Sequence, residues 1–175
     1  MIIGLVKERP AWEYRVAIIP QTIKQLIDDG YEVYVETGAG ERAGFIDEQY
    51  IEAGAIILHT AMEVYEKSEF IAKIWAPQED EYAYLHPNLW ILGNFESYKK
   101  PERTEIWQKY KINCVALERL PRLSRVQDMP TSNSSPREGR TDAPNNASMR
   151  IAFFVILKVF RPLPQGRGGG GLLKS

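Results

Sequence analysis

The sequence contains a single cysteine, Cys114, and only two histidines among its 175 residues. One cysteine cannot form an intramolecular disulfide, so nothing indicates an oxidising compartment. His59 and His86 are isolated and have no Cys or Asp at metal-ligand spacing, so each is interpreted as structural and no metal site is predicted. Cys114 lies in the apolar run 112–117 and is predicted to be a buried structural thiol.

A leader and a long apolar run are also lacking. Met1 opens directly into Ile-Ile-Gly-Leu-Val, with neither a basic start nor a small-residue cleavage site, so no signal peptide is predicted. The longest apolar run, residues 151–157, falls well short of the about 20 residues that a membrane-spanning helix needs. We therefore expect a cytoplasmic protein, which could still belong to a larger membrane complex.

The character of the chain changes near Pro130. Residues 130–147 contain almost nothing to bury, and residues 130–175 carry seven Lys/Arg and two Asp/Glu, a net charge of +5. Because the whole chain has a net charge of −1, residues 1–129 carry −6. An acidic domain gives no reason to expect nucleic-acid binding. We predict a folded domain over 1–129 and a largely disordered tail over 130–175.

Residues 1–119 alternate short apolar runs with helical patterns. Pro20 begins one helix and Gly30 ends it, Asp47 is predicted to cap a second that stops at Gly54, and residues 60–63 form a capping box. This alternation predicts an α/β fold with a parallel, Rossmann-like or flavodoxin-like sheet and helices on both faces. The expected strands are Ile2–Val6, Tyr31–Glu36, Ala55–Leu58, Phe70–Trp75, Leu89–Leu92 and Ile112–Leu117.

Ligands of such sheets bind beyond the carboxyl ends of the strands, and two cations are expected there. Arg15 follows the first strand; it either holds a carboxylate or phosphate by two parallel hydrogen bonds, or pairs with Glu13 as an ordinary loop residue. Lys73 interrupts an apolar strand near its end, so it needs a partner or a ligand unless it reaches solvent at a sheet edge. No Ser–His–Asp set stands out, and no catalytic residue is assigned.

Three further stretches resemble ligand loops. The glycines of residues 36–44 miss the G-x-G-x-x-G spacing by one, and the segment is interpreted as a turn. Residues 166–171 are followed by only four residues, so no crossover helix is possible. The segment 121–127, Pro-Arg-Leu-Ser-Arg-Val-Gln, could be an ordinary loop, but Gln127 can donate and accept at once, which suits a primary amide such as that of nicotinamide.

Several of these stretches coincide in one family. Residues 3–8, 14–17, 35–40, 44–45 and 121–127 resemble the start of alanine dehydrogenases and of the α subunit of proton-translocating NAD(P) transhydrogenase. The Pro-Arg-x-Ser-Arg-x-Gln run resembles the transhydrogenase branch in particular. The resemblance spans roughly residues 1–129.

The resemblance implies an NAD(H) site shared with a Rossmann domain, in a dimeric, peripheral part of a complex at the inner membrane. Hydride would pass between NAD(H) and NADP(H), with NADP on a partner subunit, while a proton crosses the membrane-embedded subunit. Arg122 and Gln127 would reach the nicotinamide end of NAD(H). Arg15 and Lys73 match the pair that grips the substrate in alanine dehydrogenases, but residues 93–96 lack the histidine that those enzymes use.

The chain also departs from the family pattern. Pro130 and Asn133 stand where an Asp and a Ser would complete the nicotinamide contacts, and the Rossmann domain is missing, so the NAD site is expected to be incomplete. We hypothesise that the chain from Pro130 is an out-of-frame product or part of a damaged gene. The alternatives are a fragment of an alanine-type dehydrogenase and a non-catalytic α/β remnant.

Overall fold

The computed structural model describes residues 1–96, 98–99 and 101–119. The expectations for Arg122, Gln127 and the segment 130–175 therefore lie outside the described residues. Within the described residues, no helix combines the length and the apolar character needed to cross a membrane.

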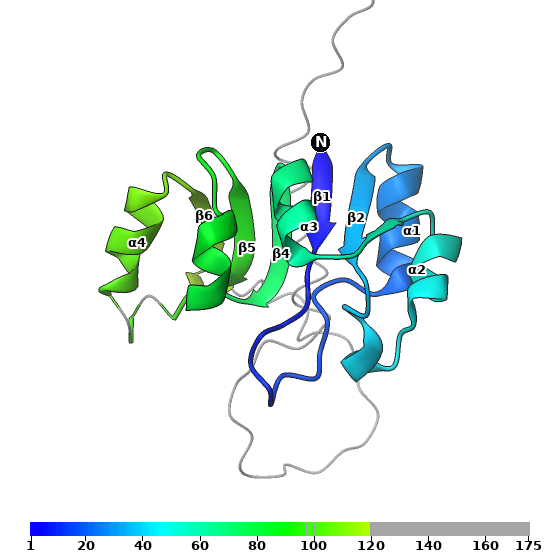
Figure 1. Cartoon of the computed structure of the whole chain (residues 1–175), viewed down its shortest axis with the longest axis horizontal. Coiled ribbons are helices and arrows are strands. Elements are labelled where there is room, and N and C mark those ends of the chain that lie inside the picture. Colours follow the sequence, from blue (N-terminus) through cyan, green and yellow to red (C-terminus); the bar gives the residue numbers. More distant parts are fainter. Residues whose placement is uncertain (97, 100, 120–175) are drawn as a thin grey trace, which may run out of the picture.

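The described residues form one six-stranded, fully parallel sheet (Figure 1). The strand order is β3-β2-β1-β4-β5-β6, so the chain first winds from the centre to one edge and then returns to build the other half. The predicted α/β fold is confirmed, with each expected strand present and its ends within two residues. The strands are β1 (Ile2–Leu5), β2 (Glu32–Glu36), β3 (Ile56–Leu58), β4 (Phe70–Trp75), β5 (Trp90–Asn94) and β6 (Asn113–Ala116).

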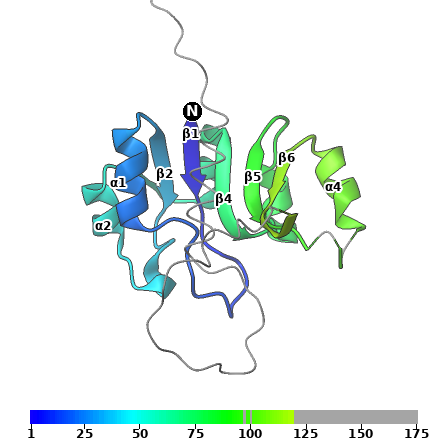
Figure 2. The same cartoon turned by 180° about the vertical axis from the view of Figure 1, so that it is seen from behind.

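Helices lie on both faces of the sheet, as predicted. One face packs against α1 (Pro20–Asp28) and α2 (Asp47–Glu52). The opposite face packs against α3 (Ala61–Lys67), the short helix η2 (Glu79–Tyr84) and α4 (Arg103–Lys109). Two single 3-10 turns, η1 (Glu41–Ala43) and η3 (Leu117–Arg119), complete the described elements. Figures 1 and 2 show the two faces in turn.

The expected start and stop signals work at most helix ends. Pro20 occupies the first turn of α1, and Gly30, with φ of 85°, follows its end. Thr60 Oγ1 accepts a hydrogen bond from the Glu63 amide while the Glu63 carboxylate accepts one from the Thr60 amide, which confirms the capping box. Each of these signals depends on residues within four positions of the helix end.

Asp47 departs from its predicted role. It is the first residue of α2 rather than the cap, and Ile46 holds the cap position. The Asp47 carboxylate instead accepts hydrogen bonds from the Gly38 amide and the Thr37 hydroxyl. The prediction of a cap was wrong because this side chain closes the loop that follows β2.

The prediction that Cys114 is buried was also wrong. Cys114 is exposed because β6 is the last strand of the sheet, with one side unpaired among the described elements. Partial removal from water, together with the nearby Glu118 carboxylate, nevertheless raises the pKa of the thiol to about 12. A thiol with so high a pKa is almost entirely protonated at neutral pH, and is therefore a poor nucleophile.

Candidate functional site

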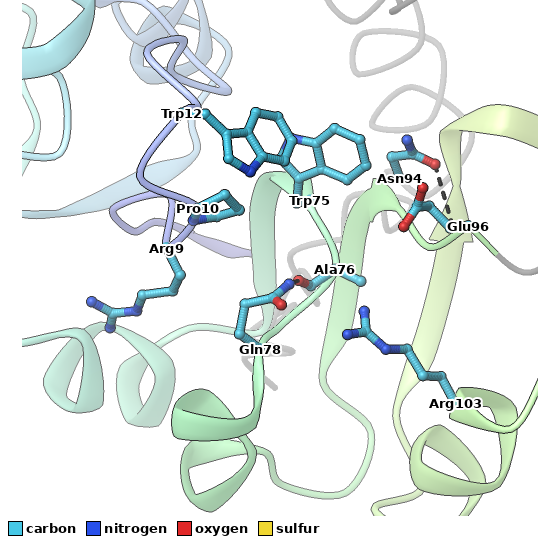
Figure 3. Close-up of a pocket in the computed structure, with 9 residues that line it drawn as sticks. All are labelled: Arg9, Pro10, Trp12, Trp75, Ala76, Gln78, Asn94, Glu96 and Arg103. Atoms are coloured by element: carbon cyan, nitrogen blue, oxygen red, sulfur yellow. Dashed lines mark hydrogen bonds between the residues drawn. The ribbon is translucent and has the colours of Figure 1, made fainter. Parts of the chain in front are cut away.

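Polar and aromatic side chains gather beyond the carboxyl ends of β1, β4 and β5. They line an open pocket of about 570 Å³ (Figure 3). The loop after β1 forms one wall, the start of the β4–η2 connection forms the floor, and the β5–α4 connection forms the other wall. The lining residues are Arg9, Pro10, Trp12, Trp75, Ala76, Gln78, Asn94, Glu96 and Arg103.

Lys73 lies beside this pocket but is completely buried. Its Nζ lies 2.7 Å from Glu81 Oε1, an ion pair whose two side chains are 1% and 0% exposed. The Lys7 carbonyl is the second acceptor, at 3.4 Å. Lys73 lies two residues after Ile71 on β4, so its side chain points to the same face of the sheet. This face packs against α3 and η2, and η2 carries Glu81.

The Glu81 carboxylate contacts several buried donors at once. Besides Lys73, it accepts hydrogen bonds from the Tyr65 hydroxyl at 3.1 Å and from the Gln78 amide at 2.9 Å. Arg9 reaches towards the same carboxylate, with Nε 3.8 Å from Glu81 Oε1 and 3.3 Å from Asp80. These donors satisfy the Glu81 carboxylate in place of solvent, and its pairing with Lys73 balances the buried ammonium inside the protein.

A second buried carboxylate, Glu8, joins the loop after β1 to β4. Its two oxygens accept hydrogen bonds from the Ile74 amide at 2.7 Å and the Trp75 amide at 3.3 Å. These amides lie where the β4–β5 pairing shifts register. Glu8 therefore accepts hydrogen bonds from backbone amides at a point where the regular pairing of the strands is interrupted. Burial raises the pKa of Glu8 above its usual 4.5, while the Lys73 ammonium opposes that change.

Arg15 is held by Glu13. Arg15 Nη2 donates to Glu13 Oε2 at 2.7 Å, and Nε donates to Oε1 at 2.8 Å, which is the two-pronged geometry of a guanidinium–carboxylate pair. The Trp75 indole Nε1 donates to the same Glu13 Oε2 at 2.7 Å. Of the two interpretations of Arg15 drawn from the sequence, the pairing with Glu13 is therefore present.

Glu13 links the loop after β1 to β4, and its removal is expected to weaken the domain in a pH-dependent way. Burial acts to raise the pKa of Glu13, but hydrogen bonds from Arg15 and Trp75 outweigh it, so the pKa lies below the usual 4.5. A lowered pKa gives stability that is present above about pH 4.5 and lost as the pH falls through the folded-state value. Glu13→Gln should therefore cost about 1–3 kcal/mol in free energy of unfolding at pH 7, and progressively less below pH 4.5.

Urea unfolding of both proteins from pH 3.5 to 7 measures this gap. Glu48→Gln, an exposed acid on α2, is the matched control and should change stability little at any pH. A gap between wild type and Glu13→Gln that stays constant across the range would contradict the role given to the ionised Glu13 carboxylate.

The pocket walls are aromatic and amphipathic. Trp12, 62% exposed, packs edge-on against Trp75 with ring centroids 5.1 Å apart. The Arg103 guanidinium points towards the Gln78 side of the pocket, whereas that of Arg9 points away from the tryptophans (Figure 3). Opposite them, Asn94 Oδ1 accepts a hydrogen bond from the Glu96 amide at 3.3 Å. Such a surface suits a flat, partly polar ligand group.

The structure gives neither of the two predicted cations a surface on the pocket. Lys73 and Arg15 both interact electrostatically with the Glu8 carboxylate. Neither Lys73 nor Arg15 is a lining residue. Sequence reasoning did not identify Trp12, Trp75 or Arg103, and the one available signal was that each stands in a segment adjoining a strand's carboxyl end.

The loop after β2 is a closed turn, in agreement with its interpretation from the sequence. The Gly38 amide, a donor that a phosphate would need, is taken by Asp47 at 2.7 Å. A Cβ at Gly40 would lie 2.6 Å from the Tyr50 ring and 2.8 Å from the Phe45 carbonyl, so the glycine is required for close packing. The Glu36 carboxylate at its start accepts a hydrogen bond from the Lys7 amide at 2.8 Å.

Comparisons with curated proteins give consistent matches. The chain is 34% identical over 134 residues to "NAD(P) transhydrogenase subunit alpha" of Haemophilus influenzae, an alignment that covers 77% of this chain and 26% of that protein. It is 36% identical over 118 residues to "Alanine dehydrogenase" of Bacillus subtilis, covering 67% of this chain and 31% of that protein. The chain thus spans about a quarter to a third of these relatives' length.

Solved structures resemble the fold to a similar extent. An "L-alanine dehydrogenase" matches with a TM-score of 0.65 and 30% identity, covering 67% of this chain and 32% of that one. The "transhydrogenase from Sinorhizobium meliloti" matches with a TM-score of 0.67 and 26% identity, covering 73% of this chain and 36% of that one. Residues 4–135 match the family described as "Alanine dehydrogenase/PNT, N-terminal domain". The chain therefore belongs to the alanine dehydrogenase/PNT family and carries the family's N-terminal domain.

Proposed function

We propose that this chain supplies the N-terminal wall of a nicotinamide-coenzyme cleft of the transhydrogenase α-subunit type. In this role it binds the nicotinamide end of NAD(H), with Arg122 and Gln127 as the contacts that the family resemblance implies. The rest of the cleft comes from a Rossmann domain that the 175 residues do not include. The alignment covers only about a quarter of the Haemophilus influenzae relative. Hydride transfer by the complete enzyme is therefore also proposed for this chain.

One observation carries the choice between the two branches of the family: within the described part of the chain, no histidine lines the pocket. Residues 93–96, where the resemblance implies the histidine of alanine dehydrogenases, read Gly-Asn-Phe-Glu, and Asn94 ends β5. His86 precedes β5 and so lies at the opposite end of the sheet, and His59 follows β3 at the far edge. An asparagine amide cannot act as a general acid or base near neutral pH. The pocket therefore suits hydride transfer between two coenzymes, which needs no proton donor, better than the reductive amination of a 2-oxo acid, which does.

The two cations support the same choice. A 2-oxo acid would need free positive groups for its carboxylate and carbonyl, but Lys73 is paired with Glu81 and Arg15 with Glu13. A substrate carboxylate would have to displace a buried carboxylate from either cation, at a large cost. The candidate substrate role of Lys73 and Arg15 is thus the weaker proposal, and a role in shaping the cleft is the stronger one.

The assembly follows from this role. We infer that NAD(H) is the coenzyme of this cleft, that NADP(H) is held by a partner subunit, and that the α-type chains form homodimers beside a membrane-embedded, proton-conducting subunit. The chain would then lie on the cytoplasmic side, peripheral to the inner membrane. Residues 1–129 form the functional domain in this proposal, and residues 130–175 lie outside it.

A chimeric subunit tests the proposal directly. Residues 1–129 would replace the matching part of the Haemophilus influenzae α subunit, assembled with its natural partner. We expect hydride transfer from NADPH to an NAD⁺ analogue. Gln127→Ala should slow it about ten- to a hundredfold, the effect of one lost hydrogen bond of about 1.4–2.8 kcal/mol in the transition state.

Gln25→Ala is the matched control, because Gln25 is exposed on α1 and does not line the pocket. It should leave the rate unchanged. Oxidation of NADH that depends on pyruvate and ammonium, in place of transfer between the two coenzymes, would assign the domain to the alanine dehydrogenase branch instead.

A further inference from the structure

One face of the sheet has no described helix over its second half. On the face that carries α1 and α2, those helices pack against β1, β2 and β3. The helices that lie near β4, β5 and β6 are on the opposite face. Figure 2 shows this arrangement: within residues 1–119, none of the helices α1 to α4 stands in front of β4, β5 or β6, and the 3-10 turn η3 follows the end of β6.

This surface, called here the β4–β6 face, is apolar. Ala72 of β4 pairs in register with Leu92 of β5, and Leu92 pairs with Val115 of β6, so the three side chains form a row across the strands. Leu117 extends the row at the end of β6. Leu92 is only 2% exposed and Ala72 is 0% exposed, which is what strands of a parallel sheet show when both faces are covered.

We propose that residues 151–160 of the same chain pack on the β4–β6 face. This segment, Ile-Ala-Phe-Phe-Val-Ile-Leu-Lys-Val-Phe, is apolar at nine of ten positions and is the longest apolar run outside the described residues. Ten residues extend about 15 Å as a helix, or about 33 Å as a strand, and both exceed the about 10 Å between the outer axes of three adjacent strands. The segment is therefore long enough to cross all three strands.

The connection permits this docking. Arg119 closes the turn that follows β6, and 31 residues separate it from Ile151. A chain of that length reaches up to about 100 Å, far more than the domain requires, and the entropic cost of closing a loop rises only slowly with its length. The charges also match, since residues 130–175 carry +5 and residues 1–129 carry −6. The β4–β6 face is a flat side of the sheet, whereas the proposed coenzyme pocket lies beyond the carboxyl ends of the strands. Docking of residues 151–160 therefore does not depend on the proposed function.

A nitroxide label on the full chain tests the proposal. Lys158 is the one polar position within the segment, so Lys158→Cys in a Cys114→Ser background places the label without removing an apolar contact. We expect the amide resonances of β5 and β6 to broaden most and those of β3, at the far edge, to stay sharp. The matched control is a label at Lys174→Cys, which should broaden neither set. Broadening that is absent, or strongest on another surface, would overturn the proposal.

Two more measurements separate this docking from its rivals. Mixing nitroxide-labelled chains with ¹⁵N-enriched, unlabelled chains should give no broadening, and broadening in that sample would mean contact between copies and overturn the intrachain proposal. The double substitution Phe153→Ser with Phe154→Ser should raise hydrogen exchange in β5 and β6 at least tenfold, and in β1 and β2 less than twofold. The control double, Leu172→Ser with Leu173→Ser, should change neither, and equal exchange in both Phe and Leu doubles would also refute the docking.

Discussion

Replacing Lys73 with methionine is expected to lower the free energy of unfolding by about 3–5 kcal/mol. The ammonium is completely buried and lies 2.7 Å from Glu81, which is itself 0% exposed. Without Lys73, the buried Glu81 carboxylate would keep, among the described residues, the hydrogen bonds of Tyr65 and Gln78 and a longer contact with Arg9, at 3.8 Å, which offset its lost hydration only in part. Since a domain of this size is stable by about 5–15 kcal/mol, much of the population would unfold at modest urea concentrations.

Equilibrium urea unfolding, followed by tryptophan fluorescence, measures this loss. Lys24→Met is the matched control, because Lys24 forms an exposed i,i+4 pair with Asp28 on α1 and should cost at most about 0.5 kcal/mol. The double variant Lys73→Met with Glu81→Gln leaves neither charge buried and should recover at least half of the loss. A Lys73→Met variant as stable as Lys24→Met would show that the pair adds nothing to the fold.

The 175-residue chain alone is expected to give no measurable heat of binding when titrated with NADH. Its pocket is open, and the aromatic and polar walls formed by Trp12, Trp75 and Arg103 can contact only one end of a dinucleotide. Tight ligand sites bury most of the surface of a ligand, and an open half-cleft cannot. In the proposed function, the adenosine and pyrophosphate contacts belong to a Rossmann domain outside this chain.

Isothermal calorimetry with the chain at about 100 µM measures dissociation constants in the micromolar range and below. A complete coenzyme site is expected to bind NADH in this range. The chimeric subunit described above serves as the positive control and should bind NADH. A micromolar dissociation constant for the isolated chain would contradict the half-cleft proposal, since a single domain would then hold the whole dinucleotide.

The local elements were the most predictable part of this protein. The strand β4 was expected with the bounds it has, and the capping box at Thr60 formed as expected. These features depend on residues that are close in sequence, so a propensity or a cap can be read without the fold. Asp47 and Cys114 were misjudged because their surroundings come from elsewhere, namely the loop after β2 and the edge position of β6.

The candidate site was only half predictable. The sequence marked Lys73 as a charge that needs a partner, because an unpaired ammonium in an apolar strand is too costly, but it did not name Glu81. It also gave no sign that Glu8 would satisfy the amides of Ile74 and Trp75, 66 and 67 residues away. Such partners are chosen by which elements the sheet brings side by side.

The sequence by itself determined the alternation of strands and helices, the family of the chain and the positions of its unusual charges. These properties follow from side-chain periodicity, turn residues and short motifs, which need no knowledge of distant contacts. Only the tertiary structure decided that Lys73 and Arg15 are neutralised by Glu81 and Glu13, and that the open pocket is lined by tryptophans instead. The physical reason is that a buried charge takes whichever opposite charge the folded chain places within a few ångströms, and that distance is set by packing.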